Sequence, residues 1–198
     1  MPRKPDAQLE DRIIHAAYKL WVEGGERALT MRAVAKGART TTPTLYERFK
    51  DKDDLLEALR TRAQTRLFDA IKPAQSIAEA CRIALEFTVT HGHEYELVAR
   101  DWAARFSRNE PTPSLDLIKV RLAEQVGGSA ADHAQLALAL ATLYHGASMM
   151  LVDERVPPET ASAIKEACVA ATNSLVASHK IEFPRSGTRS SKRSLARL

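Results

Sequence analysis

The sequence predicts an all-α protein, with a small N-terminal domain of three helices followed by a larger helical domain. Apolar residues recur at the three- and four-residue spacing of helices along almost the whole chain. Glycines and prolines interrupt that spacing where helices would end. No segment alternates apolar and polar residues for long, and there is no Asn-Gly or Asp-Gly hairpin signal, so we expect no strand.

The N-terminal helices are predicted from the residues at their ends. The first helix follows an apolar pattern over about 9–20 and ends at Gly24-Gly25, because glycine tolerates the left-handed conformation that closes a helix. Pro43 suits the first turn of the third helix, where its missing N–H costs no hydrogen bond. Side chains that can accept a backbone N–H precede three helices beginning at about 31, 42 and 52, namely Thr30, Thr41 and Asp51.

The larger domain is predicted to consist of five further helices. Glycines and prolines separate them, and Ser129 with Asp132 forms the sequence pattern of a capping box at the start of the fourth. The expected helices cover about 76–90, 95–108, 114–126, 129–152 and 159–179.

The composition is that of an ordinary globular protein, with 44% hydrophobic and 27% charged residues in 198. Nothing near the N-terminus resembles a signal peptide. The segment 134–152 comes nearest to a membrane span, but His145 and its many alanines suit a buried helix better. We therefore expect a soluble, cytoplasmic protein that does not associate with membranes.

The two cysteines, Cys81 and Cys168, lie far apart in the sequence, each within an apolar helical pattern. They offer no disulfide framework, which suits a reducing cytoplasm. We interpret them as two buried thiols, and a redox sensor is the alternative.

Basic residues gather at two ends of the chain, whose net charge is +4. One group lies between 32 and 52, and a second lies in the segment 181–198, which has no apolar period and is expected to be a disordered basic tail. Two basic ends around a more neutral body suggest a polyanionic partner. The tail itself is either a solubilising end or a weak, nonspecific grip on DNA.

Two short helices joined by a turn are predicted over about 31–49. Their apolar seam would consist of Val34, Ala35, Ala38, Leu45 and Phe49. The second helix exposes small polar residues at its N-terminal end, which allows close approach to a major groove. Nearby, Tyr46 and Lys52 supply a phenol and an ammonium group suited to phosphate oxygens. These features predict a helix-turn-helix that binds DNA.

At these residues the sequence resembles the TetR family of bacterial transcription regulators, over about 13–59. The resemblance lies in Ile14-x-x-Ala17-x-x-Leu20, Gly25, Leu29-Thr30-Met31-Arg32-x-Val34-Ala35, Pro43-Thr44-Leu45-Tyr46, Phe49-x-x-Lys52 and Leu55-Leu56. The rest of the chain matches in length, helicity and helix order. One departure is Arg39, which stands where the family usually has a glycine in the turn between the helices, with Gly37 two positions earlier. We expect the turn to shift or to carry strain there.

The resemblance implies a set of DNA contacts. Arg32 would contact phosphate or a base edge, and Thr42, Pro43 and Thr44 would lie on the base-reading face. Tyr46 and Lys52 would contact the DNA backbone. The full set implied is Arg32, Thr41, Thr42, Pro43, Thr44, Tyr46, Arg48 and Lys52.

The resemblance also implies a homodimer and an unidentified small-molecule effector. The last two long helices would form a four-helix bundle with a second subunit, which would place two recognition helices on a palindromic double-stranded DNA operator. Residues that could line an effector pocket, or else form ordinary core, are Phe87, His91, Tyr95, Trp102, Phe106, Tyr144, His145 and Met149.

We expect no catalytic site, metal site or cofactor. His91-Gly92-His93 lacks further ligands at metal-binding spacing. No phosphate-binding glycine loop or nucleophile elbow appears, so we do not expect an enzyme.

The sequence therefore predicts a ligand-responsive transcriptional repressor with three parts. These are a DNA-binding domain over 1–52, an effector-binding and dimerisation domain over 53–180, and the tail over 181–198. The alternative is an architectural DNA-binding protein of the same fold that has no effector.

Overall fold

The computed structural model describes residues 7–100, 102–108, 110–153 and 155–182, and within these ranges it contains helices and turns but no strand. The all-α fold class is therefore confirmed. The helices in chain order are α1 (Ala7–Ala28), α2 (Met31–Gly37), α3 (Thr42–Tyr46), α4 (Lys52–Ile71), α5 (Ile77–Thr90), α6 (Gly92–Ala99), α7 (Trp102–Ser107), α8 (Pro113–Val126), the 3₁₀ turn η1 (Ala130–His133), α9 (Ala134–Leu151) and α10 (Pro158–Glu182).

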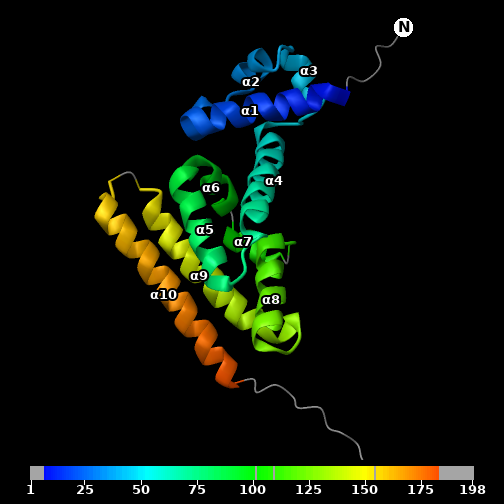
Figure 1. Cartoon of the computed structure of the whole chain (residues 1–198). Helices are drawn as coiled ribbons and strands as arrows, with labels where there is room; N and C mark the ends of the chain where they lie inside the picture. The colour runs from blue at the N-terminus through cyan, green and yellow to red at the C-terminus, as the bar shows by residue number, and fades with distance from the viewer. Residues whose placement is uncertain (1–6, 101, 109, 154, 183–198) are drawn as a thin grey trace, which may run out of the picture.

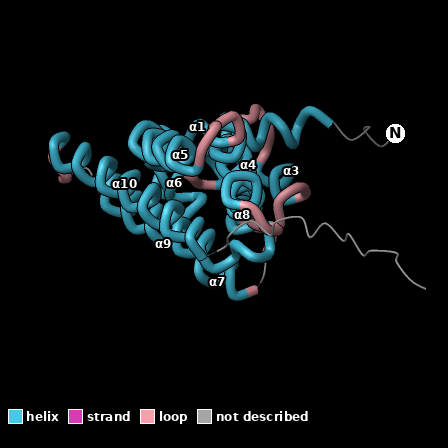
Figure 2. The backbone as a smooth tube through the Cα atoms, turned by 60° about the horizontal axis from the view of Figure 1, so that its bottom comes forward, coloured by secondary structure: helices cyan, strands magenta, loops and turns pink. Residues whose placement is uncertain are grey.

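The molecule has a small head and a larger body (Figure 1). Helices α1, α2 and α3 lie together across one end of α4, and α4 runs from this head into the body formed by α5 to α10. Helices α9 and α10 run side by side along one flank of the body, and the view in Figure 2 shows them on the side away from α3.

The core of the head is built from the apolar faces of α1 to α4. Ile13 of α1, Val34 of α2, Leu45 of α3 and Leu55 of α4 are all fully buried in one cluster. Leu97 of α6 belongs to the same cluster. The head is therefore not an independent unit, because its core is completed by the first half of α4 and by Leu97 and Val98 of α6.

The body packs around α5, which contacts α4, α6, α9 and α10. Its core consists of adjoining clusters, in which Phe87 packs with α4 and Leu85 packs with α9 and α10. A third cluster joins α8 to α9 through Leu122 and Leu140.

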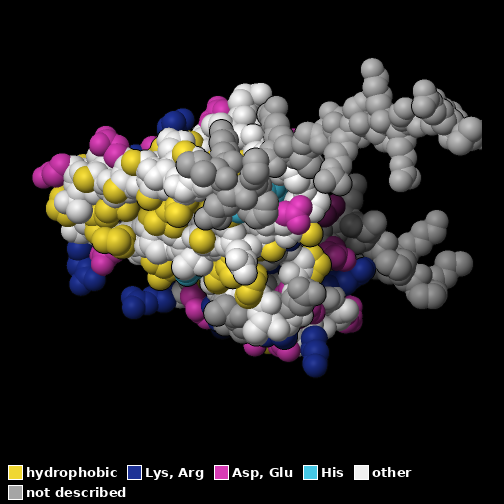
Figure 3. Space-filling model, turned by 90° about the horizontal axis from the view of Figure 1, so that it is seen from below, with side chains coloured by type: hydrophobic (Ala, Val, Ile, Leu, Met, Phe, Trp, Pro, Cys, Tyr) yellow, Lys and Arg dark blue, Asp and Glu magenta, His cyan; other side chains and the backbone are white. Residues whose placement is uncertain are grey.

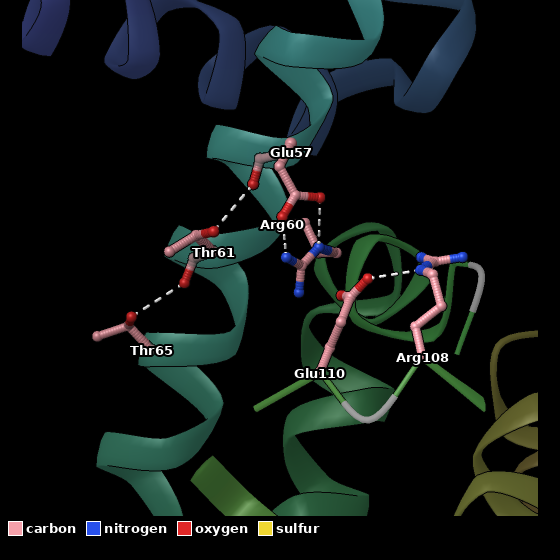
Figure 4. A network of polar contacts seen from close by, with 6 residues as sticks. All are labelled: Glu57, Arg60, Thr61, Thr65, Arg108 and Glu110. Atoms are coloured by element: carbon pink, nitrogen blue, oxygen red, sulfur yellow. Dashed lines mark hydrogen bonds and ion pairs between the residues drawn. The ribbon is translucent and has the colours of Figure 1, made fainter. Parts of the chain in front are cut away.

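A polar ladder runs along α4 where it enters the body (Figure 4). The hydroxyls of Thr61 and Thr65 donate to the carbonyls of Glu57 and Thr61, at 3.0 and 2.9 Å. Arg60 is buried and donates to the Glu57 carboxylate through Nε at 2.9 Å and through Nη2. Arg108 and Glu110, drawn in the same view, form a separate ion pair at 2.8 Å.

Most predicted helix ends agree with the structure, and two predictions were wrong in detail. The helix expected over 95–108 is two helices, α6 and α7, because the backbone at Arg100 turns to an extended conformation (φ −57°, ψ 127°). The capping box of Ser129 and Asp132 is present, but it opens the short η1 turn before α9 begins at Ala134. The predicted tail lies almost wholly outside the described residues, which end at 182.

Among the described residues, one helical stretch, Ala130–Leu151, is long and apolar enough to cross a membrane by length and composition. The same stretch packs against α5, α8 and α10, and a core helix of a soluble protein passes the same test. Only 28% of the most apolar 18-residue segment of this stretch is buried, so much of this apolar helix is left uncovered within one chain.

Candidate DNA-binding surface and effector cavity

Helix α2 begins at a threonine cap and is held against α1. The Thr30 hydroxyl accepts the Ala33 N–H at 3.2 Å, as the sequence predicts. Val34 and Ala35 face the core, whereas Arg32 is exposed on the outer face of the helix. Gly37 allows close approach to α1, because a Cβ there would lie 3.1 Å from the Cβ of Ala16.

The turn between α2 and α3 contains a residue in the left-handed conformation, although that residue is not a glycine. Arg39 has φ 54°, the only positive φ among the described non-glycine residues. The Ala38 and Thr40 N–H groups donate back to the carbonyls of Val34 and Ala35, at 2.8 and 2.9 Å, so backbone hydrogen bonds close the helix end. The turn has therefore kept its geometry, and Arg39 carries the strain that a Cβ causes in this region.

Helix α3 presents a small polar surface. The Thr41 hydroxyl accepts the Thr44 N–H at 3.3 Å and lies 2.9 Å from the Thr44 hydroxyl. Leu45 is fully buried and anchors the helix in the core of the head. Pro43 is exposed, and Tyr46 has 50% of its surface exposed, so both project from the outer side of the helix. Thr42 and Thr44 are half-buried beside them.

Lys52, at the start of α4, lies against the end of α1. Its ammonium is 3.5 Å from a carboxylate oxygen of Glu26 and 3.4 Å from the Glu26 carbonyl oxygen. Glu26 also accepts a hydrogen bond from Arg100 at 3.1 Å, and this bond is the main reason that the pKa of Glu26 is lowered. The Lys52 ammonium is therefore partly neutralised by the Glu26 carboxylate.

A cavity of about 150 Å³ lies in the body, where α4, α5, α6, α8 and α9 converge. Four of the eight residues predicted from the sequence line it, namely Tyr95, Trp102, Tyr144 and His145. The other four do not. Phe87 is buried in the core, His91 lies 3.4 Å from Glu94, and Phe106 and Met149 are largely exposed.

Most of the apolar wall consists of residues that the sequence did not predict. They come from several helices and are mainly small or aliphatic, such as Leu67, Ala80, Ala84, Ile118, Leu140 and Ala141. Alanines on α5 leave room for the cavity, but their spacing resembles that of any packed helix. Which alanine faces a void depends on how neighbouring helices are placed, so no local signal could have found them.

The polar groups of the cavity are few and neutral. The Tyr95 hydroxyl lies 2.7 Å from Nδ1 of His145, and the Tyr144 hydroxyl lies 3.1 Å from that of Thr88. Burial lowers the pKa of His145 and raises that of Tyr144 to about 12, so both side chains are neutral near pH 7. Trp102 stacks on the His145 ring with centroids 5.5 Å apart. None of the described lining residues is an Asp, Glu, Lys or Arg.

The described residues bring together no group of three or more side chains that could hold a metal ion. In the His91-Gly92-His93 segment, each histidine lies beside a carboxylate. Nδ1 of His91 is 3.4 Å from Glu94, and Nδ1 of His93 is 3.2 Å from Glu96. Both pairs join residues three apart, within α6 and its N-cap.

Comparison with known proteins places the head in a family. The family model described as bacterial regulatory proteins, tetR family, matches residues 13–59, which build α1 to α3 and the start of α4. Residues 13–59 therefore form the N-terminal domain of a TetR-family regulator. The matched residues are the stretch over which the sequence resembles that family, so the resemblance is confirmed.

The rest of the chain is less similar to known relatives. The HTH-type transcriptional repressor KstR2 of Mycolicibacterium smegmatis is 27% identical over 132 residues, which cover 63% of this chain and 62% of the repressor. The aligned part therefore spans less than two thirds of that relative.

Solved structures show that the fold extends over nearly the whole chain. A TetR-like transcriptional regulator from Rhodococcus sp. RHA1 is 20% identical, with a TM-score of 0.57 and 91% and 100% of the two chains covered. A TetR transcriptional regulator from Streptomyces coelicolor is 18% identical, with a TM-score of 0.62 and 86% and 97% covered. At this identity the likeness establishes the TetR fold alone.

Proposed function

We propose that this TetR-family protein is a ligand-responsive transcriptional repressor that binds a palindromic operator as a homodimer. The observation that carries the proposal is the outer surface of α2 and α3, where small polar residues and a half-exposed tyrosine project from a helix that is only five residues long. A short helix with few large side chains can enter a major groove closely enough for its side chains to reach base edges.

The proposed contacts fall into two classes, those to phosphates that position the protein and those to base edges that read the sequence. Tyr46 and Lys52 hold the phosphate backbone, with Arg32 and the less central Arg48 as further cationic contacts. Thr42, Pro43 and Thr44 read base edges from the exposed side of α3. Thr41 belongs to the same surface, but its hydroxyl already accepts the Thr44 N–H, so its main effect is to hold Thr44 in place.

The proposed dimer interface is the uncovered face of α9 and α10. On α9, Ala139, Thr142, Gly146 and Met149 recur at helical spacing and are all exposed, and Met150 beside them has 54% of its surface exposed. On α10 the matching exposed stripe consists of small residues, namely Ala163, Ala167, Ala170, Ser174 and Ala177. Hydrophobic side chains gather on the flank of the molecule where these two helices lie (Figure 3).

This face fits a second copy of the same chain. Small residues let two helices approach closely, and two antiparallel pairs of helices bury such stripes in a four-helix bundle. A two-fold dimer repeats the head on the other side of the axis. Two copies of α3 about 34 Å apart would then enter successive major grooves of an inverted repeat.

The proposed effector is a small, largely apolar molecule in the cavity. Its neutral, mostly aliphatic wall favours such a ligand, and the Tyr95–His145 pair offers one polar contact point. Tyr95 is carried by α6, which also touches the head. Leu97 packs in the head core, and the Trp21 indole donates to the His93 carbonyl.

Movement of α6 can therefore change the position of the head. Arg66 of α4 donates both to Glu94 of α6 and to the Tyr18 hydroxyl of α1, and Arg100 at the end of α6 bonds to Glu26 of α1. A ligand that displaces α6 acts on both helices that carry α2 and α3. Such a ligand would lower operator affinity by favouring a spacing of the heads that does not match the grooves.

Selection of bound fragments from random or genomic DNA tests the proposal, followed by a salt titration of the best fragment. We expect an inverted repeat whose affinity falls steeply with salt. In a plot of log binding constant against log salt concentration, each neutralised phosphate contributes a slope of about −0.9. Steep salt dependence without an enriched sequence would favour the architectural alternative. Absence of binding at low salt would refute the DNA-binding role.

A second experiment addresses the effector. Small apolar compounds are screened for those that weaken the complex with the selected fragment, and each hit is repeated with Ala141→Phe, which fills the cavity from α9. We expect the variant to bind DNA while losing its response to the compounds. Compounds that act equally on the variant would place the effector elsewhere.

A further inference from the structure

The fold brings Cys81 and Cys168 together although 87 residues separate them. Cys81 lies on α5 and Cys168 on α10, and their sulfur atoms are 3.7 Å apart. Both are free thiols, Cys81 half-buried and Cys168 buried. A disulfide has an S–S bond of about 2.05 Å, so the two sulfurs need to approach by roughly 1.7 Å to form one.

The surroundings of the two sulfurs differ. Cys81 lines the cavity, whereas Cys168 packs behind it with Leu85 and Ala147. The Thr172 hydroxyl, one turn along α10 from Cys168, donates to the Cys81 sulfur at 3.6 Å and also lines the cavity. A molecule in the cavity therefore meets Cys81 first, with Cys168 held directly behind.

We propose that Cys81 and Cys168 form an oxidation site at which Cys81 reacts with an organic hydroperoxide in the cavity and Cys168 then closes a disulfide between α5 and α10. In the first step the Cys81 thiolate attacks the terminal peroxide oxygen and the O–O bond breaks. The leaving alkoxide takes up a proton and becomes an alcohol, and Cys81 becomes a sulfenic acid. In the second step the Cys168 sulfur attacks the Cys81 sulfur, and the S–O bond breaks. The oxygen leaves as water after it takes up the Cys168 proton.

The balance of these steps is one hydroperoxide and two thiols giving one alcohol, one water and one disulfide. The peroxide accepts two electrons, one from each sulfur. The pKa shifts of the two thiols favour attack by Cys81 first and by Cys168 second. The hydrogen bond from Cys168, together with that from Thr172, lowers the pKa of the Cys81 thiol despite its burial, and the same contact with Cys81 raises the pKa of Cys168. Cys81 is thus the nucleophile and Cys168 the resolving thiol.

The cavity selects the class of oxidant. Its wall is apolar, and its volume of about 150 Å³ equals that of an engineered cavity in another protein that remains dry and binds benzene. A hydroperoxide with a small hydrocarbon group gains from burial there, whereas hydrogen peroxide does not. The probe that fits this reasoning is tert-butyl hydroperoxide, with hydrogen peroxide as its polar counterpart.

The experiment treats the reduced full-length protein with each peroxide and follows its intact mass. We expect wild type to lose two hydrogens without forming a cross-linked dimer, with tert-butyl hydroperoxide reacting roughly tenfold faster than hydrogen peroxide, since one or two buried methyl groups supply that difference. Cys168→Ser should stop at a sulfenic acid that dimedone captures, and Cys81→Ser should not react. Thermal unfolding of both serine variants, which are nearly isosteric with wild type, confirms that they fold.

Several results would overturn the proposal. They are the absence of an intramolecular disulfide, equal capture of sulfenic acid in both serine variants, or hydrogen peroxide reacting as fast as the organic peroxide. These readouts do not involve DNA, so their failure is separate from failure of the proposed repressor function. Helix α10 also carries the proposed dimer face, so the disulfide could change operator affinity. That effect rests on the proposed repressor function, and it is measured in a separate DNA-binding experiment.

Discussion

At the scale of single residues, Arg39 is where the sequence and its conformation disagree most. Its φ of 54° lies in the left-handed region, where a Cβ crowds the following carbonyl. The two hydrogen bonds that close α2 across this turn hold it there. Position 39 therefore has a backbone conformation that suits glycine, although it holds an arginine. The resulting strain lowers the stability of the head.

Replacing Arg39 with glycine should stabilise the protein. We expect Arg39→Gly to raise the free energy of unfolding by about 0.5–1 kcal/mol, because relief of the left-handed strain exceeds the added entropy of the unfolded chain. Chemical denaturation measures the change. Arg39→Ala is the matched control, since it removes the charge but keeps the Cβ. Equal stabilisation by alanine would assign the effect to charge and not to the backbone.

Side chains on the proposed DNA surface should separate into two classes. Lys52→Gln should weaken binding to every sequence and reduce the salt slope by about one, because one phosphate contact is lost. Tyr46→Phe should weaken binding equally on all sequences without changing the slope. Thr44→Val should alter the preferred sequence, since we propose that the Thr44 hydroxyl contacts base edges.

Fluorescence anisotropy against a panel of single-base variants of the selected operator measures these effects. Lys119→Gln on α8 is the matched control, because this lysine is paired with Asp116 at the opposite end of the body. Equal losses on all sequences for Thr44→Val would contradict its reading role. A changed slope in the Lys119 variant would mean that the positive charge acts over a longer range than a direct contact.

At the scale of elements, local side chains determine where the helices of the head begin. Thr30, Thr41 and Asp51 each accept a backbone N–H three residues further on, at 3.2, 3.3 and 2.9 Å. These distances confirm the caps that the sequence predicts. The proposed boundary at residue 52 stays a prediction, since the first half of α4 packs in the core of the head.

The Thr30 cap can be tested by itself. Thr30→Ala should lower the free energy of unfolding by about 1 kcal/mol, because the Ala33 N–H loses its acceptor. Thr30→Ser keeps the hydroxyl and should cost much less. Denaturant titration followed by circular dichroism distinguishes the two. If serine were as harmful as alanine, the lost methyl packing and not the cap would explain the effect.

The capping box before α9 should make the protein sensitive to acid. Hydrogen bonds from the Ser129 N–H and hydroxyl lower the pKa of Asp132. A carboxyl group with a lowered folded pKa stabilises the fold above its unfolded pKa, and this contribution is lost as pH falls through the folded pKa. Asp132→Asn should therefore show a smaller drop in melting temperature between neutral and strongly acidic pH. An unchanged drop would show that other carboxyl groups dominate acid unfolding.

At the scale of the whole molecule, the uncovered face of α9 and α10 is the feature that a single chain does not explain. A Cβ placed at Gly146 would meet no heavy atom within 4 Å, so a larger side chain fits on the monomer. A continuous stripe of small and apolar residues along two adjacent helices is rare on the surface of a monomer and usually marks an interface. These facts support a second subunit as its cover.

If the protein forms the proposed dimer, Gly146→Arg should convert it to a monomer without unfolding the chain. Within one chain the arginine has open space and better helix propensity than glycine, but it would clash in a closely packed four-helix interface. Sedimentation velocity at micromolar concentration measures the change. Val120→Arg, at an exposed apolar position of α8, is the control and should remain dimeric. A dimeric Gly146 variant would place the interface elsewhere.

The sequence alone determined the features that depend on neighbouring residues. The all-α class, the caps at Thr30, Thr41 and Asp51, the breaks at glycine and proline, and the resemblance over 13–59 all follow from local chemistry, because a helix begins and ends according to the few residues at its ends. Arg100 is the exception. No glycine or proline marks it, yet its extended backbone divides the predicted helix 95–108 into α6 and α7.

Tertiary structure decided which distant side chains meet. Only the placement of α5 against α10 brings Cys81 within 3.7 Å of Cys168. Only the convergence of several helices leaves a void bounded by Tyr95 and Tyr144 but not by Phe87 or Met149. Helical periodicity tells which side of a helix is apolar but not which neighbour covers it. The cavity and the thiol pair depend on crossing angles and on the packing of small residues, which are properties of the whole core.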